Sequence, residues 1–318
     1  MRRRQFLALL SAAATCQAVA WAQAPKRLAR VGVLVIHSPE PFLREFKETL
    51  RRLGYVEGQN MQIELRSAQG KPDLLPGLAA ELAGLKVDIL VAWQTPAAHA
   101  AKQATTTIPI VISAGDPVGT GLVASLARPG GNITGMSNIT AGLGAKTLEL
   151  IRELLPSAKR VAVLANDADP FTKPFLEHIQ SAGEAMAIEI RPLRVRGVDE
   201  FDAAFAQMAQ WRADMVIVQP SLARDAAISR ALKNRFPTIS AMRAFPDAGG
   251  LMSYAPSPTQ SFREVAVYVD KILKGAKPAD LPMQQPTTFE LVINAKTASN
   301  LGISLPRALL LRADQIIE

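Results

Sequence analysis

The sequence predicts an α/β protein built from two doubly wound parallel-sheet lobes. Its 318 residues are enough for about two domains of ordinary size. Short apolar runs of strand length alternate with amphipathic helical patterns along most of the chain. The strand runs are apolar on both faces, which is typical of parallel sheets covered by helices on both sides.

The first half of the chain contains four strand–helix units and a fifth strand. The first unit joins an apolar run at 31–36 to a helical pattern at 42–53, which ends before Gly54, a residue that favours helix ends. The later units repeat this order of a strand followed by a helix. The expected strands are 61–65, 88–92, 108–112 and 133–136, and the expected helices are 74–85, 96–104 and 121–127.

After Gly144 the alternation restarts, which indicates a second lobe of similar size. The expected helices are 146–155, 171–186, 200–211 and 224–233, and the expected strands are 160–165, 188–193, 215–218 and 238–240. A long helix at 261–273, a strand at 289–293 and a helix at 296–301 complete the pattern. These extra C-terminal segments indicate a chain that crosses between the lobes more than once.

The N-terminal 22 residues have the three parts of an export signal: arginines at 2–4, an apolar run at 6–15, and small residues before a cleavage point after Ala22. The apolar run is shorter than the roughly 20 residues of a membrane span. The twin-arginine route and the general secretory route both fit, and a lipoprotein modified at Cys16 is the alternative. The expected location is therefore outside the cytoplasm.

Composition excludes several chemistries from the mature chain. Cys16 is the single cysteine, so the chain after residue 22 has no disulfide, thiolate nucleophile or cysteine metal ligand. The three histidines, His37, His99 and His178, lack metal-ligand spacing. Without residues 1–22 the chain has 33 basic and 28 acidic residues, a net charge of +5 with no stripe for nucleic acid. We expect no metal, no cofactor and no nucleic-acid partner.

Ligands of open α/β sheets bind beyond the carboxyl ends of the strands, so the residues after each strand are the candidate site. Ser38 and Thr95 either cap helices, leaving free N–H groups for a ligand carboxylate, or have only that capping role. Trp93 and Phe42 either stack on a ligand or belong to the core, and Asp116 either accepts an ammonium group or closes a turn. The other candidates at strand ends are Gln94, Ser113, Asn166, Gln219 and Ala241.

No catalytic grouping is found among these residues. The sequence has no G-x-S-x-G elbow, and 142–147 lacks the Gly-Lys pair of a phosphate loop. We therefore predict no catalytic residues.

Six segments, in order along the chain, resemble the ABC transporter substrate-binding protein family that includes tryptophan-binding TrpX-like proteins. They are GYVEGQN at 54–60, GDPVG at 115–119, LARPGGNITG at 126–135, GGLMSY at 249–254, FELVIN at 289–294 and LRAD at 311–314. The resemblance implies a type I periplasmic binding fold, with two Rossmann-like lobes, three crossovers and a ligand held between the lobes. It places lobe 1 at 28–137 plus 256–283 and lobe 2 at 138–255 plus 284–318, and adds Ser137, Asn138 and Tyr254 to the expected site.

The resemblance further implies a monomeric periplasmic receptor that is not an enzyme. It would capture a small molecule, an amino acid or an aromatic carboxylate, and deliver it to an ABC permease in the inner membrane. The alternative from the residues is an exported two-lobe enzyme, a glycosyl transferase or hydrolase, with Asp116 and His37 as its only candidate acid and base.

Overall fold

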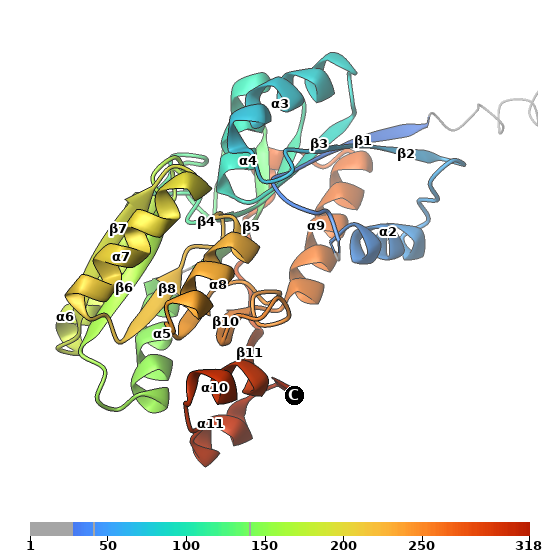
Figure 1. Ribbon diagram of the computed structural model, residues 1–318. Helices are drawn as coiled ribbons and strands as arrows, with labels where there is room; N and C mark the ends of the chain where they lie inside the picture. The colour runs from blue at the N-terminus through green and yellow to red at the C-terminus, as the bar shows by residue number, and fades with distance from the viewer. Residues whose placement is uncertain (1–27, 41, 140) are drawn as a thin grey trace, which may run out of the picture.

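The computed structural model describes residues 28–40, 42–139 and 141–318 and contains two β-sheets. The expected export signal at 1–22 and Cys16 lie outside these residues. We call the first sheet with its helices lobe 1 and the second sheet with its helices lobe 2. In Figure 1, lobe 1 is at the upper right and lobe 2 at the lower left.

Lobe 1 is a five-stranded, all-parallel sheet with helices on both faces. Its strands run in the order β2-β1-β3-β4-β5, with bounds β1 (Ala29–Val35), β2 (Met61–Ser67), β3 (Ile89–Trp93), β4 (Ile110–Gly115) and β5 (Ile133–Ile139). Its helices are α2 (Phe42–Arg52), α3 (Leu75–Gly84), α4 (Thr95–Ala104) and α9 (Pro258–Leu273). Successive side chains of a strand point to opposite faces, so Val33 packs against α2 and α9 while Leu34 packs against α3 and α4.

Lobe 2 has a seven-stranded sheet in the order β12-β11-β10-β9-β8-β6-β7, parallel except for the antiparallel pair β10–β11. Its strands are β6 (Arg160–Asn166), β7 (Glu189–Val195), β8 (Met215–Val218), β9 (Thr238–Ser240), β10 (Met252–Pro256), β11 (Phe289–Asn294) and β12 (Gln315–Ile317). Its helices are α5 (Ala141–Leu154), α6 (Thr172–Ala185), α7 (Phe201–Trp211), α8 (Arg224–Lys233), α10 (Ala295–Leu301) and α11 (Arg307–Arg312). Single 3₁₀ turns lie at Pro72–Leu74, Val198–Glu200 and Pro278–Asp280.

The two lobes share one strand order, and the chain passes between them three times. The order β7-β6-β8-β9-β10 in lobe 2 repeats the order β2-β1-β3-β4-β5 in lobe 1. The passages follow β5, follow β10, and follow Gln284, which bridges to Met136 of lobe 1 before the chain enters β11. The predicted fold class, two doubly wound parallel-sheet lobes, is confirmed.

One expected helix, at 121–127, is wrong: the structure has turns there. The N–H groups of Leu122 and Val123 both donate to the Pro117 carbonyl, and the backbone of Gly121 has a φ of +73°. Lys102 Nζ donates to the carbonyls of Gly121 and Leu122, which a helix would use itself. The strands β10 and β12 and the helix α11 were missing from the expected elements.

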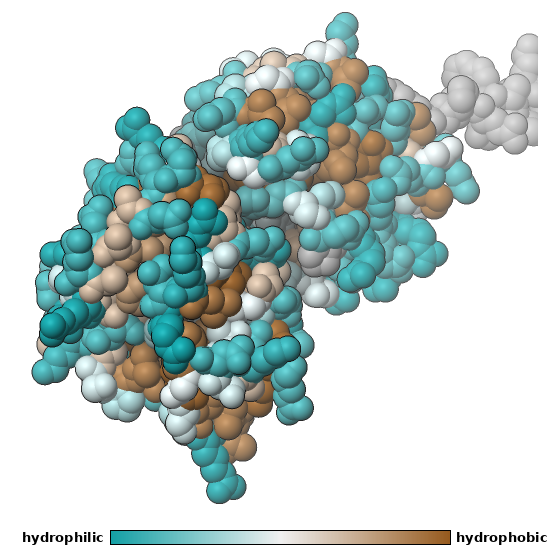
Figure 2. Space-filling view, in the orientation of Figure 1, coloured by the Kyte–Doolittle hydropathy of each residue, from teal (hydrophilic) through white to brown (hydrophobic). Residues whose placement is uncertain are grey.

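The surface of both lobes is mostly hydrophilic on the face shown in Figure 2, with hydrophobic residues in separate small groups. Within residues 28–40, 42–139 and 141–318, no helix has the length and apolar character needed to cross a membrane.

Candidate functional site

A cavity of about 1080 Å³ lies between the two lobes, at the carboxyl ends of their strands. Lobe 1 contributes the loops after β1 and β3, and lobe 2 contributes the loops after β6 and β8. These pairs of strands flank the point in each sheet where the strand order reverses, which is where doubly wound folds bind ligands. The volume is near the top of the roughly 300–1,000 Å³ range of small-molecule sites.

Most of the candidate residues lie on the wall of this cavity. Those that line it are Ser38, Phe42, Trp93, Gln94, Thr95, Ser113, Asn138, Gln219 and Ala241. Those that are not part of its wall are Asp116, Ser137, Asn166 and Tyr254. Candidate residues that follow parallel strands in the two lobes therefore lie around the same cavity.

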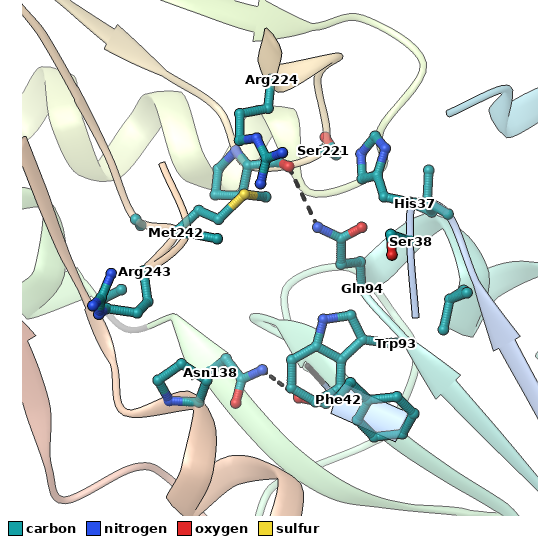
Figure 3. Close-up of a pocket in the computed structure, with 18 of the residues that line it drawn as sticks. His37, Ser38, Phe42, Trp93, Gln94, Asn138, Ser221, Arg224, Met242 and Arg243 are labelled. Atoms are coloured by element: carbon teal, nitrogen blue, oxygen red, sulfur yellow. Dashed lines mark hydrogen bonds between the residues drawn. The ribbon is translucent and has the colours of Figure 1, made fainter. Parts of the chain in front are cut away.

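The lobe 1 wall carries an aromatic cluster. The ring of Trp93 lies 5.1 Å from that of Phe42 and 4.7 Å from that of Phe262, centroid to centroid. Phe42 and Phe262 are buried, whereas Trp93 is only half-buried. Figure 3 shows Trp93 and Phe42 side by side on the lobe 1 side of the pocket. Phe42 is thus mainly a core residue, and Trp93 combines packing with an accessible surface in the cavity.

The two hydroxyls proposed as helix caps differ in their partners, and the expectation is corrected for Thr95. Thr95 is the first residue of α4, and its hydroxyl accepts from the Gly115 N–H at 3.1 Å, tying α4 to the end of β4. Ser38 Oγ accepts from the Glu40 N–H at 3.4 Å, the bond expected of an N-cap residue, and the Leu43 N–H donates to the Pro39 carbonyl at 2.8 Å in the helical pattern. Thr95 does not cap α4, whereas Ser38 has the predicted capping contact at the start of the turn that leads into α2 (Phe42–Arg52).

Gln94 joins the two lobes directly. Its Nε2 donates to the Pro220 carbonyl of lobe 2 at 3.3 Å, as the dashed line in Figure 3 shows. Its backbone φ of +73° lies in the left-handed region, which is uncommon for a residue other than glycine. Such strain is often found at functional sites.

Asn138 offers an acceptor at the point where the chain first leaves lobe 1. Its Nδ2 donates to Ser113 Oγ, and both residues line the cavity. Its Oδ1 is buried and has no hydrogen-bond partner among the residues that the structure describes. An unpaired buried acceptor is costly, so a ligand donor would satisfy it.

The lobe 2 wall carries a buried polar network centred on Gln219. Gln219 Oε1 accepts from the Asn166 N–H at 2.9 Å and from Thr172 Oγ1 at 3.0 Å, and its Nε2 donates to Asp169 Oδ2 at 3.0 Å. Asp169 Oδ1 accepts from the Phe171 N–H at 2.9 Å. Burial raises the pKa of the Asp169 carboxyl above its usual value. Asn166 therefore supports the wall from behind.

The remaining candidates outside the wall have local roles. The carboxylate of Asp116 accepts from the Gly119 N–H at 2.9 Å and closes the turn that its φ of +35° begins. Ser137 is a buried residue of β5, and Tyr254 stacks on Phe289 with ring centroids 5.5 Å apart. Asp116 therefore lies outside the cavity wall, and its carboxylate has a partner within its own turn.

Charged residues line the lobe 2 side of the cavity, and Figure 3 shows one of them, Arg224, across from His37 of lobe 1. Arg224 pairs with Asp225 at 2.7 Å. Burial, followed by the positive charge of Arg224, lowers the pKa of His37 below its ordinary 6.5. These surroundings therefore favour the neutral form of the His37 imidazole.

Several wall residues were not among the predicted site residues. They are His37, Asp169, Phe171, Ser221, Arg224, Met242, Arg243 and Phe262. Most come two to six residues after the end of a strand of lobe 2, so the same strand-end rule, applied that far along each loop, would have included them. Phe262 lies on α9, whose return to lobe 1 depends on long-range packing that no local pattern reveals.

Comparisons with known proteins agree with this architecture. The family model for ABC transporter substrate binding proteins matches residues 31–317. A protein of Clostridioides difficile (strain R20291) named tyrosine-binding protein is 27% identical over 286 residues, which cover 87% of this chain and 82% of that protein.

Two solved structures are similar over nearly the whole chain. A conserved domain protein from Vibrio cholerae O1 biovar El Tor has 30% sequence identity and a TM-score of 0.85, covering 91% of this chain and 100% of that one. An ABC domain from Streptococcus pneumoniae in complex with L-Trp has 27% identity and a TM-score of 0.83, covering 91% and 99%.

Proposed function

The chain belongs to the ABC transporter substrate-binding protein family, and from this premise we propose that it captures an amino acid in the cavity between its lobes. The observation that carries the proposal is that both lobes line the cavity, with half-buried Trp93 on one wall and a buried polar network on the other. Such a site offers an apolar surface for the side chain of an amino acid and fixed polar groups for its amino and carboxyl groups.

An aromatic or large apolar amino acid is the favoured ligand. One relative is named tyrosine-binding protein and another was solved in complex with L-Trp. Trp93 supplies a flat surface on which a ligand ring can pack, and offset or tilted aromatic pairs add stabilisation beyond their buried area. Met242, on the lobe 2 wall, adds an adaptable apolar side chain.

Closure of the lobes is the mechanism we propose for capture and delivery. A ligand that contacts both walls stabilises the arrangement in which the walls are close, because it binds that state better than the open one. The bond from Gln94 to the Pro220 carbonyl is of the kind that closure would strengthen. The closed form would then be the one that an inner-membrane permease accepts.

The alternative function, an exported two-lobe enzyme, is not favoured. Its expected acid, Asp116, is outside the cavity wall. The family and the relatives described above are binding proteins. We retain a monomeric receptor as the working proposal, because one chain supplies both walls of the cavity.

The test of the proposed function is a thermal-shift panel of the twenty L-amino acids on residues 23–318. At a free ligand concentration of about 100 times the Kd, linkage stabilises the folded state by about 2.7 kcal/mol, so the melting temperature rises by several degrees. We expect the largest rises with L-tryptophan, L-tyrosine or L-phenylalanine. A panel in which no amino acid raises the melting temperature would refute the proposal.

We also propose that the chain is exported and cleaved after Ala22. Intact-mass measurement of the protein from the periplasmic fraction is then expected to give a chain that begins at Gln23. A full-length mass, or a lipid-modified chain that begins at Cys16, would show that this cleavage is wrong.

A further inference from the structure

Asp169 is a buried acid on the cavity wall, only 6% exposed. The other acidic residues of the wall have different surroundings. Asp225 pairs with Arg224, Asp247 and Glu290 pair with Arg243, and Glu40 is exposed to solvent. Among the wall residues described, Asp169 is thus the buried carboxylate without an ion-pair partner. Buried charges are normally paired, so Asp169 is a candidate partner for a positively charged group of the ligand.

The network around Asp169 is arranged for its ionised form. The backbone N–H of Asn166 donates to Gln219 Oε1, which fixes the orientation of the amide. Gln219 Nε2 must therefore face Asp169 as a donor, and the Phe171 N–H is a second donor. The Ser221 side chain is a third hydrogen-bond partner of this carboxyl group. Donors aimed at both oxygens of a carboxyl group favour the carboxylate over the protonated acid.

Burial opposes these donors, because it raises the pKa of Asp169. Hydrogen bonds from neutral groups do not fully replace the lost solvation of a buried charge. A cationic group brought into the cavity would offset that cost. A cationic ligand next to Asp169 would therefore lower the free energy of this buried carboxylate.

The surroundings of Asp169 suit an organic cation. No group of three or more His, Cys, Asp or Glu residues that could hold a metal ion is present in the described part of the chain. Asn138 Oδ1, a buried wall acceptor with no hydrogen-bond partner among the described residues, would also accept from an N–H donor. An ammonium group carries three such donors and a positive charge.

We propose that Asp169 is the acceptor for the ammonium group of the ligand, so that the site selects an amino acid over the corresponding aromatic carboxylate. The inference rests on the proposed function, since it assigns a role within the same cavity. It moves the expected ammonium site from Asp116 of lobe 1 to Asp169 of lobe 2. A ligand held by Asp169 and by Trp93 would contact both lobes.

The test is calorimetric titration of the wild type and of Asp169→Asn with two matched pairs of probes. The pairs are L-tryptophan with indole-3-propionate, and L-tyrosine with 3-(4-hydroxyphenyl)propionate; the second member of each lacks only the amine. For the wild type we expect the amino acid to bind about 10- to 100-fold more tightly than its deaminated partner. In Asp169→Asn we expect most of this preference to disappear.

Asp167→Asn is the matched control. Asp167 lies two residues away in the same loop, but its exposed carboxylate pairs with Arg194 and Arg196 and is not part of the cavity wall. We expect this variant to keep the full preference for the amino acids. A loss of the same size in Asp167→Asn would mean that the loop, and not the Asp169 charge, sets affinity, and would overturn the proposal.

The wild-type comparison stands even where Asp169→Asn folds poorly. Equal affinity of the wild type for an amino acid and its deaminated partner would overturn the ammonium role without any variant. A folded Asp169→Asn that keeps the wild-type preference would do so too, while leaving the receptor function intact. If no amino acid bound the wild type, the proposed function itself would fail and this inference with it.

Discussion

Trp93→Ala is expected to weaken ligand binding by about 1–3 kcal/mol while leaving the two-lobed fold in place. Trp93 packs against Phe42 and Phe262 on one side and remains half-buried on the cavity wall. The substitution removes the accessible aromatic surface but leaves both phenylalanine rings, on α2 and α9, and the strand β3 that carries residue 93. Titration of the variant with the amino acid that gives the largest thermal shift measures the loss.

Trp211→Ala is the control for this variant. Trp211 ends α7 in lobe 2, where Arg191 lies 4.7 Å from its ring, and it is not part of the cavity wall. We expect its substitution to lower stability without changing affinity. Unchanged affinity in Trp93→Ala, together with a lower melting temperature, would mean that Trp93 is a core residue only.

Gly135→Ala is expected to destabilise the protein by roughly 3 kcal/mol or more. Gly135 of β5 has a φ of +132° and pairs with Ile112 of β4. A Cβ atom there would lie 2.2 Å from the Ile112 carbonyl oxygen and 2.7 Å from its nitrogen. Because both are backbone atoms, the clash can be relieved only if β4 and β5 move apart beneath the cavity. Urea unfolding followed by circular dichroism measures the change in the free energy of unfolding.

Two other glycines separate backbone strain from steric conflict. Gly54 has a φ of +94° and open space where a Cβ would lie, so Gly54→Ala isolates the backbone cost of about 1 kcal/mol. Gly77 of α3 has open space and no positive φ, so Gly77→Ala is expected to be neutral or to stabilise by up to about 1 kcal/mol. A cost for Gly135→Ala no greater than that for Gly54→Ala would contradict the predicted clash.

Most of the fold could be predicted because most helices and strands are recognisable from residues that are close together in the sequence. Strands buried on both faces are continuous apolar runs, and the helices between them repeat at helical spacing. The missed strand β10 has a long-range cause. It joins β9 in parallel and β11 antiparallel, and the β11 pairing depends on the passage of the chain through α9 in lobe 1.

The site was predictable in position but not in detail. Asp116 and Asp169 both come after a strand that leads to the cleft, and sequence alone gives no reason to prefer one. The carboxylate of Asp116 accepts a hydrogen bond from the Gly119 N–H, three residues away in the sequence, and lies outside the cavity wall. The carboxylate of Asp169 accepts a hydrogen bond from Gln219, which is 50 residues away in the sequence. Gln219 comes next to Asp169 only when β6 and β8 pair in the lobe 2 sheet.

The most direct test of the account is a crystal structure of residues 23–318 grown with the amino acid that gives the largest thermal shift. We predict one ligand between the lobes, with its ammonium group within hydrogen-bond distance of Asp169 and its side chain against Trp93. A ligand bound outside this cavity, or contacting one lobe only, would contradict capture by closure of the two lobes.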